Sequence, residues 1–249
     1  MNQSEYLKII KLAKTAINEY KNWGEEEIVT EQLVQPKKQE PSLKPAENIK
    51  QDKNAEQLLE ELKKKIINCQ KCGLGATRLN AVFGSGSAYA DIMFVGEGPG
   101  FQEDHKGQPF IGRAGDLLTK IIEAMHYTRE TVYIANIVKC HPMKDSSNPE
   151  LRSNDRPPTP QEMASCHPYL DEQIKIINPK VIVTLGASST RALLKTEELM
   201  GNLRGKFQEY NGIKLMPTYH PAALLRNPNL KKDVWQDMKK VMAFIGKKA

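Results

Sequence analysis

The spacing of four cysteines constrains the fold of this chain more than any other feature. Cys69 and Cys72 form a Cys-x-x-Cys pair, and the only other cysteines in the 249 residues are Cys140 and Cys166. A Cys-x-x-Cys pair alone fits zinc, a redox dithiol or an iron–sulfur cluster. Zinc ribbons usually hold their second pair close together, whereas here that pair is widely separated. A centre that used all four thiolates would join distant parts of the chain, and unrelated buried thiols remain the alternative.

Charge and the start of the chain suggest a compartment and a partner. No secretory or membrane-spanning segment opens the sequence, so we expect a cytoplasmic protein with reduced thiols and no membrane contact. Residues 1–50 contain eight Lys and eight Glu without Arg or Asp, so the net charge of +6 falls on residues 51–249. This excess fits a DNA or RNA partner, although a lysine-rich surface without such a partner has the same composition.

The sequence divides into three parts. Residues 1–24 predict an amphipathic helix, which could dock on a protein partner or on its own domain, with apolar positions at Tyr6, Ile10, Ala13, Ile17 and Tyr20. Residues 25–53 are charged and interrupted by prolines, which predicts a flexible linker. Residues 54–249 form the main domain, and a helix that begins near Asn54 leads to the first cysteine pair.

Short apolar runs alternate with helical patterns after residue 72, which predicts an α/β domain with a parallel sheet covered on both faces. Strands are expected at Ile92–Gly96, Thr131–Val138, Lys180–Gly186 and Leu215–Tyr219. Helices are expected at Gly115–Met125, Pro160–Ile177, Ala187–Leu194 and Asp233–Ile245. Asn211-Gly212 predicts a tight hairpin turn before the last strand.

Three segments follow expected strands and should meet at the carboxyl edge of the sheet, where open α/β sheets bind ligands. They are Gly96-Glu97-Gly98-Pro99-Gly100, Ala135-Asn136, and the stretch that runs from His220 to Arg226. Each segment also has a simpler interpretation without a ligand: an ordinary turn for the glycines, and for Asn136 and His220 a side chain that hydrogen-bonds the main chain of its own loop. An Asn side chain can nevertheless read a pyrimidine edge with its paired donor and acceptor, and a His can donate to developing negative charge.

Taken in order, these motifs resemble those of the family 4 uracil-DNA glycosylases, the iron–sulfur class. The motifs are CxxC, GEGPGxxED, PFIGRAG, ANIVKC, a PTPQE helix that leads to a cysteine, and HPAALLR. The resemblance covers about residues 60–245. It implies a three-layer α/β/α fold around a central, mainly parallel four-stranded sheet, with a helical N-terminal extension. It also implies a [4Fe-4S] cluster held by Cys69, Cys72, Cys140 and Cys166.

The resemblance assigns roles to individual residues. Phe110 would stack on a uracil flipped out of DNA, Asn136 would read its edge, and His220 would stabilise the departing uracil anion. Glu97 would orient or activate water, or stabilise the positive sugar. The first glycine-rich segment would line the same pocket through Gly96, Gly98, Pro99 and Gly100. The segment that enters the minor groove would be Leu224, Leu225 and Arg226.

The activity implied is hydrolysis of the N-glycosidic bond of deoxyuridine in DNA, as in base excision repair. No Lys occupies a motif position that would form a Schiff base, so no lyase activity is expected, and a monomer is expected. Residues 143–156 form a polar insertion, predicted to be an exposed loop, in a region where a related group traps DNA covalently through a histidine. This insertion has no His, so trapping is the lesser alternative, beside a non-catalytic DNA-binding module or an electron carrier.

Overall fold

The computed structural model describes residues 54–247, and the predicted helix over 1–24 and linker over 25–53 lie outside them. The chain divides into two units, Met1–Asp52 and Lys53–Ala249, of which the second is described below. No helix between residues 54 and 247 is both long and apolar enough to cross a membrane.

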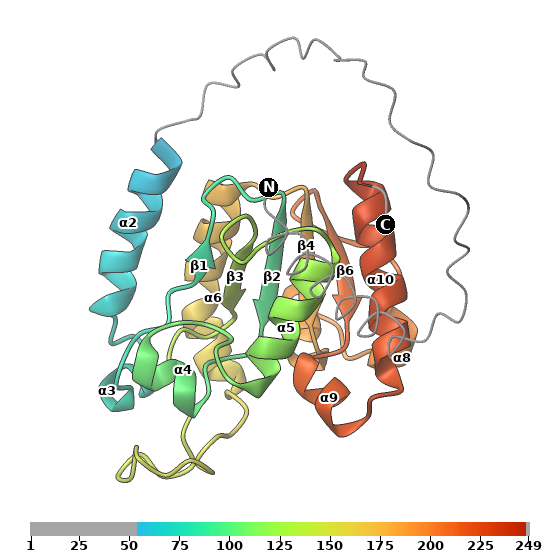
Figure 1. Cartoon of the computed structure of the whole chain (residues 1–249). Coiled ribbons are helices and arrows are strands. Elements are labelled where there is room, and N and C mark those ends of the chain that lie inside the picture. Colours follow the sequence, from blue (N-terminus) through green and yellow to red (C-terminus); the bar gives the residue numbers. More distant parts are fainter. Residues whose placement is uncertain (1–53, 248–249) are drawn as a thin grey trace, which may run out of the picture. The chain divides into compact units, whose positions relative to one another are not determined.

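Four parallel strands form the centre of the sheet, and all four were predicted. They are β2 (Ile92–Gly96), β3 (Tyr133–Asn136), β4 (Val181–Leu185) and β6 (Ile213–Thr218). The sheet order is β1-β3-β2-β4-β6-β5, and β3-β2-β4-β6 pair in parallel (Figure 1). Every residue of β2, β3 and β4 is buried, as expected for parallel strands covered on both faces.

The sheet has six strands, so the expected number of four was wrong. The two additions are short antiparallel edge strands, β1 (Ser85–Gly86) beside β3 and β5 (Gln208–Tyr210) beside β6. Both are too short and too exposed to produce a recognisable pattern of alternating hydrophobicity. The predicted hairpin turn is confirmed, because Asn211 (φ 50°) and Gly212 (φ 81°) join β5 to β6 with the two positive φ angles of a type I′ turn.

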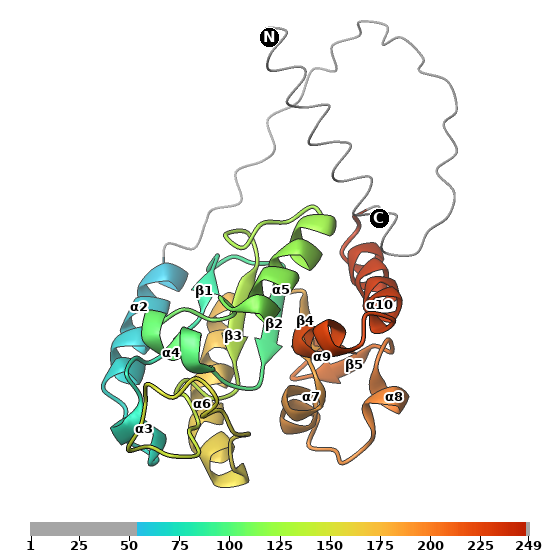
Figure 2. The same cartoon turned by 60° about the horizontal axis from the view of Figure 1, so that its bottom comes forward.

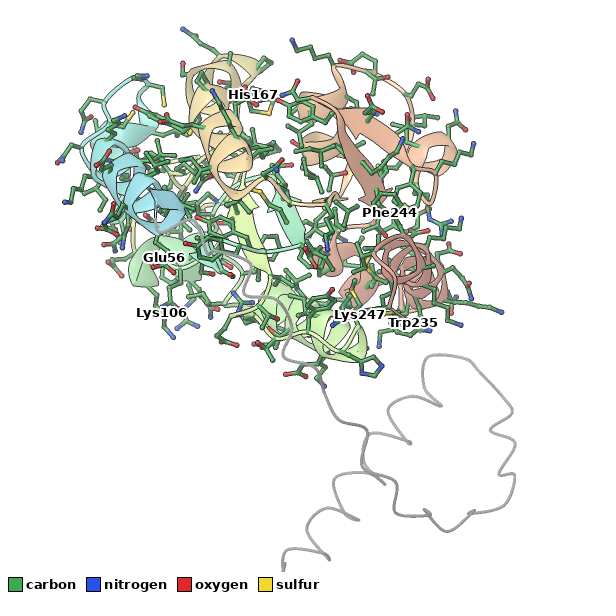
Figure 3. The ribbon with its side chains drawn as sticks, turned by 90° about the horizontal axis from the view of Figure 1, so that it is seen from above. Glu56, Lys106, His167, Trp235, Phe244 and Lys247 are labelled. Carbon is green, nitrogen blue, oxygen red and sulfur yellow. The ribbon has the colours of Figure 1, made fainter. Side chains whose placement is uncertain are left out.

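Helices cover both faces of the sheet and make the predicted three layers. One face carries α2 (Asn54–Ile67), α6 (Pro160–Ile177) and α7 (Ala187–Leu194), and the other carries α5 (Arg113–Ala124), α9 (Pro221–Arg226) and α10 (Leu230–Phe244). Figure 3 looks from above along the strands, with His167 of α6 on one side of the sheet and Trp235 of α10 on the other. Short helices α3 (Leu74–Thr77), α4 (Phe101–Lys106) and α8 (Met200–Leu203) complete the unit.

Local signals explain why several of these elements begin where they do. Thr159 caps α6, because its side chain accepts a hydrogen bond from the Glu162 amide at 3.2 Å. Pro160 occupies the first helical position, which favours a helix start, and the helix has its predicted bounds. Helices α4 and α9 were not predicted, because six residues are too few to show a helical period. Both follow central strands and therefore lie at the carboxyl edge of the sheet (Figure 2).

Candidate functional site

A cleft of about 1050 Å³ opens at the carboxyl edge of the parallel strands. Its walls come from the loops after β2, β3, β4 and β6, which is where an open α/β sheet binds ligands. Four residues that the sequence singled out line it together: Glu97, Phe110, Asn136 and His220. Gly98, Pro99, Gly100 and Arg226 line it as well. The three segments predicted to meet at this edge therefore do meet.

Gly96, the last residue of β2, lies beneath the cleft and allows two other residues to approach each other. A Cβ atom at this position would stand 2.4 Å from Asn136 Oδ1 and 2.5 Å from Phe110 Cζ. Both distances are below any normal contact, so only glycine permits this packing. Gly96 therefore shapes the floor of the cleft, whereas the neighbouring Gly98 and Gly100 line its wall.

The side chain of Asn136 ends in a buried acceptor that lacks a partner. The residue is 2% exposed, and its Oδ1 accepts no hydrogen bond within the part of the chain that the structure describes. A buried polar atom without a partner costs about 1–3 kcal/mol, so folded proteins rarely keep one without a use. Asn136 and Phe110 both line the cleft, and Oδ1 is suited to accept a hydrogen bond from an N–H group of a ligand.

His220 is held as a neutral imidazole beside Phe110. It caps α9, and its Nδ1 accepts the Ala222 amide hydrogen at 3.1 Å, so the ring proton resides on Nε2. Burial, reinforced by the positive charge of Arg226, lowers the pKa of His220 to about 4. Its ring centroid lies 5.6 Å from that of Phe110. The cleft thus contains an N–H donor that stays uncharged at neutral pH.

Glu97 follows β2 directly and is half-buried in the wall of the cleft. The main chain on either side of it is fixed by the next strand, since Ile137 donates to the Gly96 carbonyl at 2.9 Å and Val138 to the Glu97 carbonyl at 3.1 Å. Glu103 holds the rest of the loop, because its carboxylate accepts the amide hydrogens of Gly100 and Ile111. The position of Glu97 is therefore set by the sheet.

Residues 224–226 were predicted as a loop that enters DNA, and the structure corrects this for one of them. They form the end of helix α9, and Leu224 is 0% exposed. Its side chain packs inside the protein and cannot reach a DNA groove in this conformation. Leu225 is 40% exposed, and Arg226 is exposed as well, so these two remain able to contact DNA.

The four cysteines line a second, small pocket, and none forms a disulfide. Cys69 and Cys72 follow α2, Cys140 follows β3, and Cys166 lies on α6. Arg78 Nη1 donates to Cys140 Sγ at 2.9 Å, and the Lys139 amide donates to Cys166 Sγ at 3.3 Å. Burial raises the pKa of the Cys140 thiol to about 11. Distant parts of the chain are thus brought to one place, as the spacing predicted.

The four thiols are candidate ligands of a metal centre. Among residues 54–247, no three His, Cys, Asp or Glu side chains converge as ligands of one ion. A structural zinc needs its sulfurs at about 2.3 Å from a single point. An iron–sulfur cluster instead uses one cysteine for each iron and leaves the sulfurs farther apart. Four cysteines around a common pocket, with N–H donors to two of the sulfurs, are a donor set that either centre can use.

Residues 143–156 were predicted to be an exposed polar loop, and its tip is exposed (Figure 2). Its base is ordered by Asn154, which is 1% exposed and donates to the carbonyls of Asp145 at 2.7 Å and Asn148 at 3.0 Å. Nearby His141 is 1% exposed and contacts Asp155 at 2.7 Å and Asp104 at 3.5 Å. Burial lowers its pKa, but the two carboxylates outweigh this and raise it to about 9.

Sequence reasoning missed one wall of the cleft. The junction of β4 and α7, with Leu185, Gly186, Ala187 and Ser188, lines it, as do the prolines Pro157 and Pro158. Residues 185–188 could have been predicted from the sequence, because β4 was predicted and the segments at the carboxyl edge of neighbouring parallel strands share one crevice. Arg191 and Glu197 also line this wall, and nothing in their sequence context marked them.

Comparison with known proteins identifies the family. The model of the uracil DNA glycosylase superfamily matches residues 83–239. A type-4 uracil-DNA glycosylase of Sulfurisphaera tokodaii is 46% identical over 192 residues, which are 74% of this chain and 83% of that protein. The type-4 enzymes of Saccharolobus solfataricus (44%, covering 74% and 84%) and Thermotoga maritima (41%, covering 77% and 97%) are similar too. The chain belongs to the uracil DNA glycosylase superfamily, and within it to the type-4 uracil-DNA glycosylases.

Proposed function

We propose that this protein is a DNA-repair glycosylase that flips uracil out of DNA and hydrolyses its N-glycosidic bond, leaving an abasic site. One observation carries this proposal beyond family membership. The buried, unpartnered Asn136 Oδ1, the Phe110 ring and the neutral His220 line one cleft. Together they offer an acceptor, a stacking face and a donor, which is the set that a flipped uracil needs.

Binding of the base follows from the chemistry of these groups. Uracil presents an N3–H donor beside an O4 acceptor, and the Asn136 amide offers the complementary Oδ1 acceptor and Nδ2 donor. Cytosine presents an acceptor at N3 and a donor at N4, so with the amide in this orientation Oδ1 would face the N3 acceptor with no hydrogen between them. The Phe110 ring supplies a stacking face that tolerates any base, and Asn136 therefore supplies the selectivity.

Departure of the base follows from His220. When the N-glycosidic bond breaks, the electron pair stays on uracil and negative charge develops on its oxygens. A neutral Nε2–H donates a hydrogen bond to uracil O2 as this charge appears, without transferring a whole proton. Because burial lowers the pKa of His220 to about 4, this donor is uncharged at neutral pH.

Glu97 completes the reaction on the sugar. Its carboxylate orients or activates the attacking water, or stabilises the positive charge that develops on the sugar. None of the described residues that line the cleft is a lysine, so no amine is placed to form a Schiff base. We therefore infer a monofunctional hydrolase without lyase activity. Leu225 and Arg226 enter the minor groove beside the flipped base.

The cofactor we propose is a [4Fe-4S] cluster on Cys69, Cys72, Cys140 and Cys166. Hydrolysis of the glycosidic bond needs no electron, so the chemistry that the cluster supplies is a structural cross-link. The chain's own contribution is to hold four thiolates at the ends of α2, β3 and within α6, with Arg78 donating to one of the sulfurs.

The remaining proposals concern the setting of the enzyme. We infer that it acts as a monomer in the cytoplasm and that residues 54–249 form the glycosylase domain. We also infer that the predicted helix over 1–24 binds a protein partner and that the predicted linker over 25–53 joins it to that domain. Covalent trapping is not favoured by the geometry. His141 is 1% exposed and faces two carboxylates, so it is not available to attack a sugar.

The experiment that tests the function is uracil release from a labelled oligonucleotide with a single uracil, by protein purified without oxygen. Alkali then breaks abasic sites before a denaturing gel. A shorter labelled strand only after alkali supports the monofunctional hydrolase, and a shorter strand before alkali contradicts the absence of lyase activity. An intact strand with a shifted protein band would instead indicate trapping, and an intact strand alone would contradict the proposed activity.

A further inference from the structure

The backbone of Phe110 adopts an unusual conformation. Its φ is 53°, in the left-handed region that a bulky side chain rarely occupies. Such a conformation costs free energy and persists only where surrounding contacts enforce it, most often at functional sites. The residue is also 6% exposed, so its ring has little freedom. The contacts that hold this turn therefore decide where the stacking face lies.

Arg129 makes contacts that hold it. Its guanidinium donates from Nη1 to the Phe110 carbonyl at 3.0 Å and from Nη2 to the Pro109 carbonyl at 2.7 Å. Nη1 also donates to Thr119 Oγ1 at 3.2 Å, and this hydroxyl donates in turn to the Gly115 carbonyl at 3.1 Å. The planar fork of an arginine can bond two successive carbonyls at once, which a lysine ammonium cannot do with the same geometry.

The rest of the turn leaves no room for another arrangement. A Cβ atom at Gly115 would lie 1.9 Å from the Phe110 carbonyl oxygen, so the first turn of α5 presses directly against this peptide. Gly96 presses against the far side of the ring. Arg129 itself is half-buried, and burial lowers its pKa. A buried guanidinium that bonds main-chain oxygens is costly unless the geometry it enforces has a use.

We propose that Arg129 is a positioning residue for uracil recognition, which clamps the Pro109–Phe110 turn so that the Phe110 ring is preorganised to stack on the flipped base. This inference rests on the proposed function and goes beyond it, because no sequence motif marked Arg129. It acts only through Phe110 and does not itself touch the base or the reacting atoms.

The test is the affinity of the cluster-loaded, full-length protein for two DNA duplexes. One carries 2′-fluoro-2′-deoxyuridine, which binds as uracil but resists hydrolysis, and the other carries a tetrahydrofuran abasic site, which has no base to stack. Arg129→Lys should weaken binding to the fluorouridine duplex about tenfold, as expected for the loss of one charge-assisted hydrogen bond. Binding to the abasic duplex should not change.

A double-mutant cycle separates positioning from general stability. In a Phe110→Leu background, Arg129→Lys should have no further effect on fluorouridine binding, because the ring that it positions is absent. Arg204→Lys is a control for the loss of a half-buried guanidinium, since Arg204 bonds a main-chain carbonyl, that of Asp233 at 3.0 Å, pairs with Asp237 and has no hydrogen bond to the Phe110 turn among the described residues. It should lower the melting temperature without changing the preference between the two duplexes.

Two results would overturn the inference. An equal loss of affinity for both duplexes would make Arg129 a general structural residue, and an undiminished effect in the Phe110→Leu background would show that it does not act through the ring. Wild-type protein that binds the fluorouridine duplex no better than the same duplex with thymine in its place would contradict the proposed function itself. Wild type that prefers it, together with an unchanged Arg129→Lys variant, would contradict this inference alone.

Discussion

The catalytic role proposed for His220 rests on its protonation state and its surroundings together. Its Nδ1 is occupied by the Ala222 amide, so Nε2–H is the only donor that it can offer to a ligand. We predict that His220→Ala binds uracil-DNA normally but releases uracil about 10²–10³ times more slowly, the usual effect of removing one such donor. Single-turnover kinetics with enzyme in excess measures this directly. Unchanged release, or equal losses of affinity and rate, would remove His220 from the chemistry.

The lowered pKa of His220 also predicts how stability depends on pH. Its ordinary value is 6.5, and the folded protein holds it at about 4, so the unfolded chain binds more protons between these values. The contribution of His220 to the free energy of unfolding is therefore complete above pH 6.5 and is lost as the pH falls through that window. Wild type should lose stability relative to His220→Gln on acidification, as measured by denaturant unfolding at several pH values. A difference that stays constant with pH would contradict the buried, neutral state.

At the level of single residues, the sequence predicted the candidate residues that line the cleft better than the residues that hold them in position. Asn136, Phe110, Glu97 and His220 could be singled out because each follows a strand or lies in a motif, and the carboxyl-edge rule then placed them together. Arg129 could not be found in this way. It lies after α5 and contacts carbonyls 19 and 20 residues earlier, and no local pattern encodes a contact with the main chain at that distance.

Helix α9 shows how an element changes the meaning of adjacent residues. Leu224 and Leu225 are neighbours in sequence, but the helix turns the first into the core (0% exposed) and the second outward (40% exposed). We predict that Leu224→Ala lowers the free energy of unfolding by about 2–5 kcal/mol, as for other buried leucines. Leu225→Ala should leave stability nearly unchanged and weaken binding to uracil-DNA.

The two variants control for each other, because the chemical change is identical and only the direction of the side chain differs. Thermal melting and titration of DNA by fluorescence anisotropy, on both proteins, are the measurements required. Normal DNA affinity in Leu225→Ala would exclude this helix end as the segment that enters the groove. Normal stability in Leu224→Ala would contradict the burial of Leu224, which is the reason for removing it from the residues expected to enter the minor groove.

Elements were predictable where they were long or bounded by strong signals. Helix α6 was predicted to the residue, because a capping box and a proline mark its start, and Asn178 in a left-handed conformation ends it. The edge strands β1 and β5 were not predicted, although the hairpin turn that joins β5 to β6 was. A hairpin turn implies a strand on both sides, and this inference would have supplied β5 from Asn211-Gly212 alone.

On the scale of the whole molecule, the cysteine pocket connects segments that the sheet does not otherwise hold. Helix α2 packs on α6 through an apolar core that includes Leu59, Leu62 and Ile66, and Cys166 belongs to the same core. The following segment, residues 68–78, has few buried side chains, and Arg78 reaches back to Cys140 and to the Ile67 carbonyl. Farther along, Asp104 accepts the amide hydrogens of Leu79 and Asn80, each at 3.0 Å. The segment is thus fixed at both ends and tied between them by cysteines.

Removal of the cluster should therefore loosen a defined region and spare the rest. With the proposed cluster bound, we predict that oxidation and chelation lower the melting temperature and speed amide hydrogen exchange in residues 68–78, while β4 and β6 keep their protection, because their amides are paired along five residues of the parallel sheet. Cys140→Ala should behave in the same way, with reduced solubility. Hydrogen exchange read by mass spectrometry, beside visible absorbance as a measure of cluster content, tests this. Protection of residues 68–78 that survives full loss of the cluster would show that protein contacts alone hold the segment, and global loss of protection would show that the cluster stabilises the whole sheet.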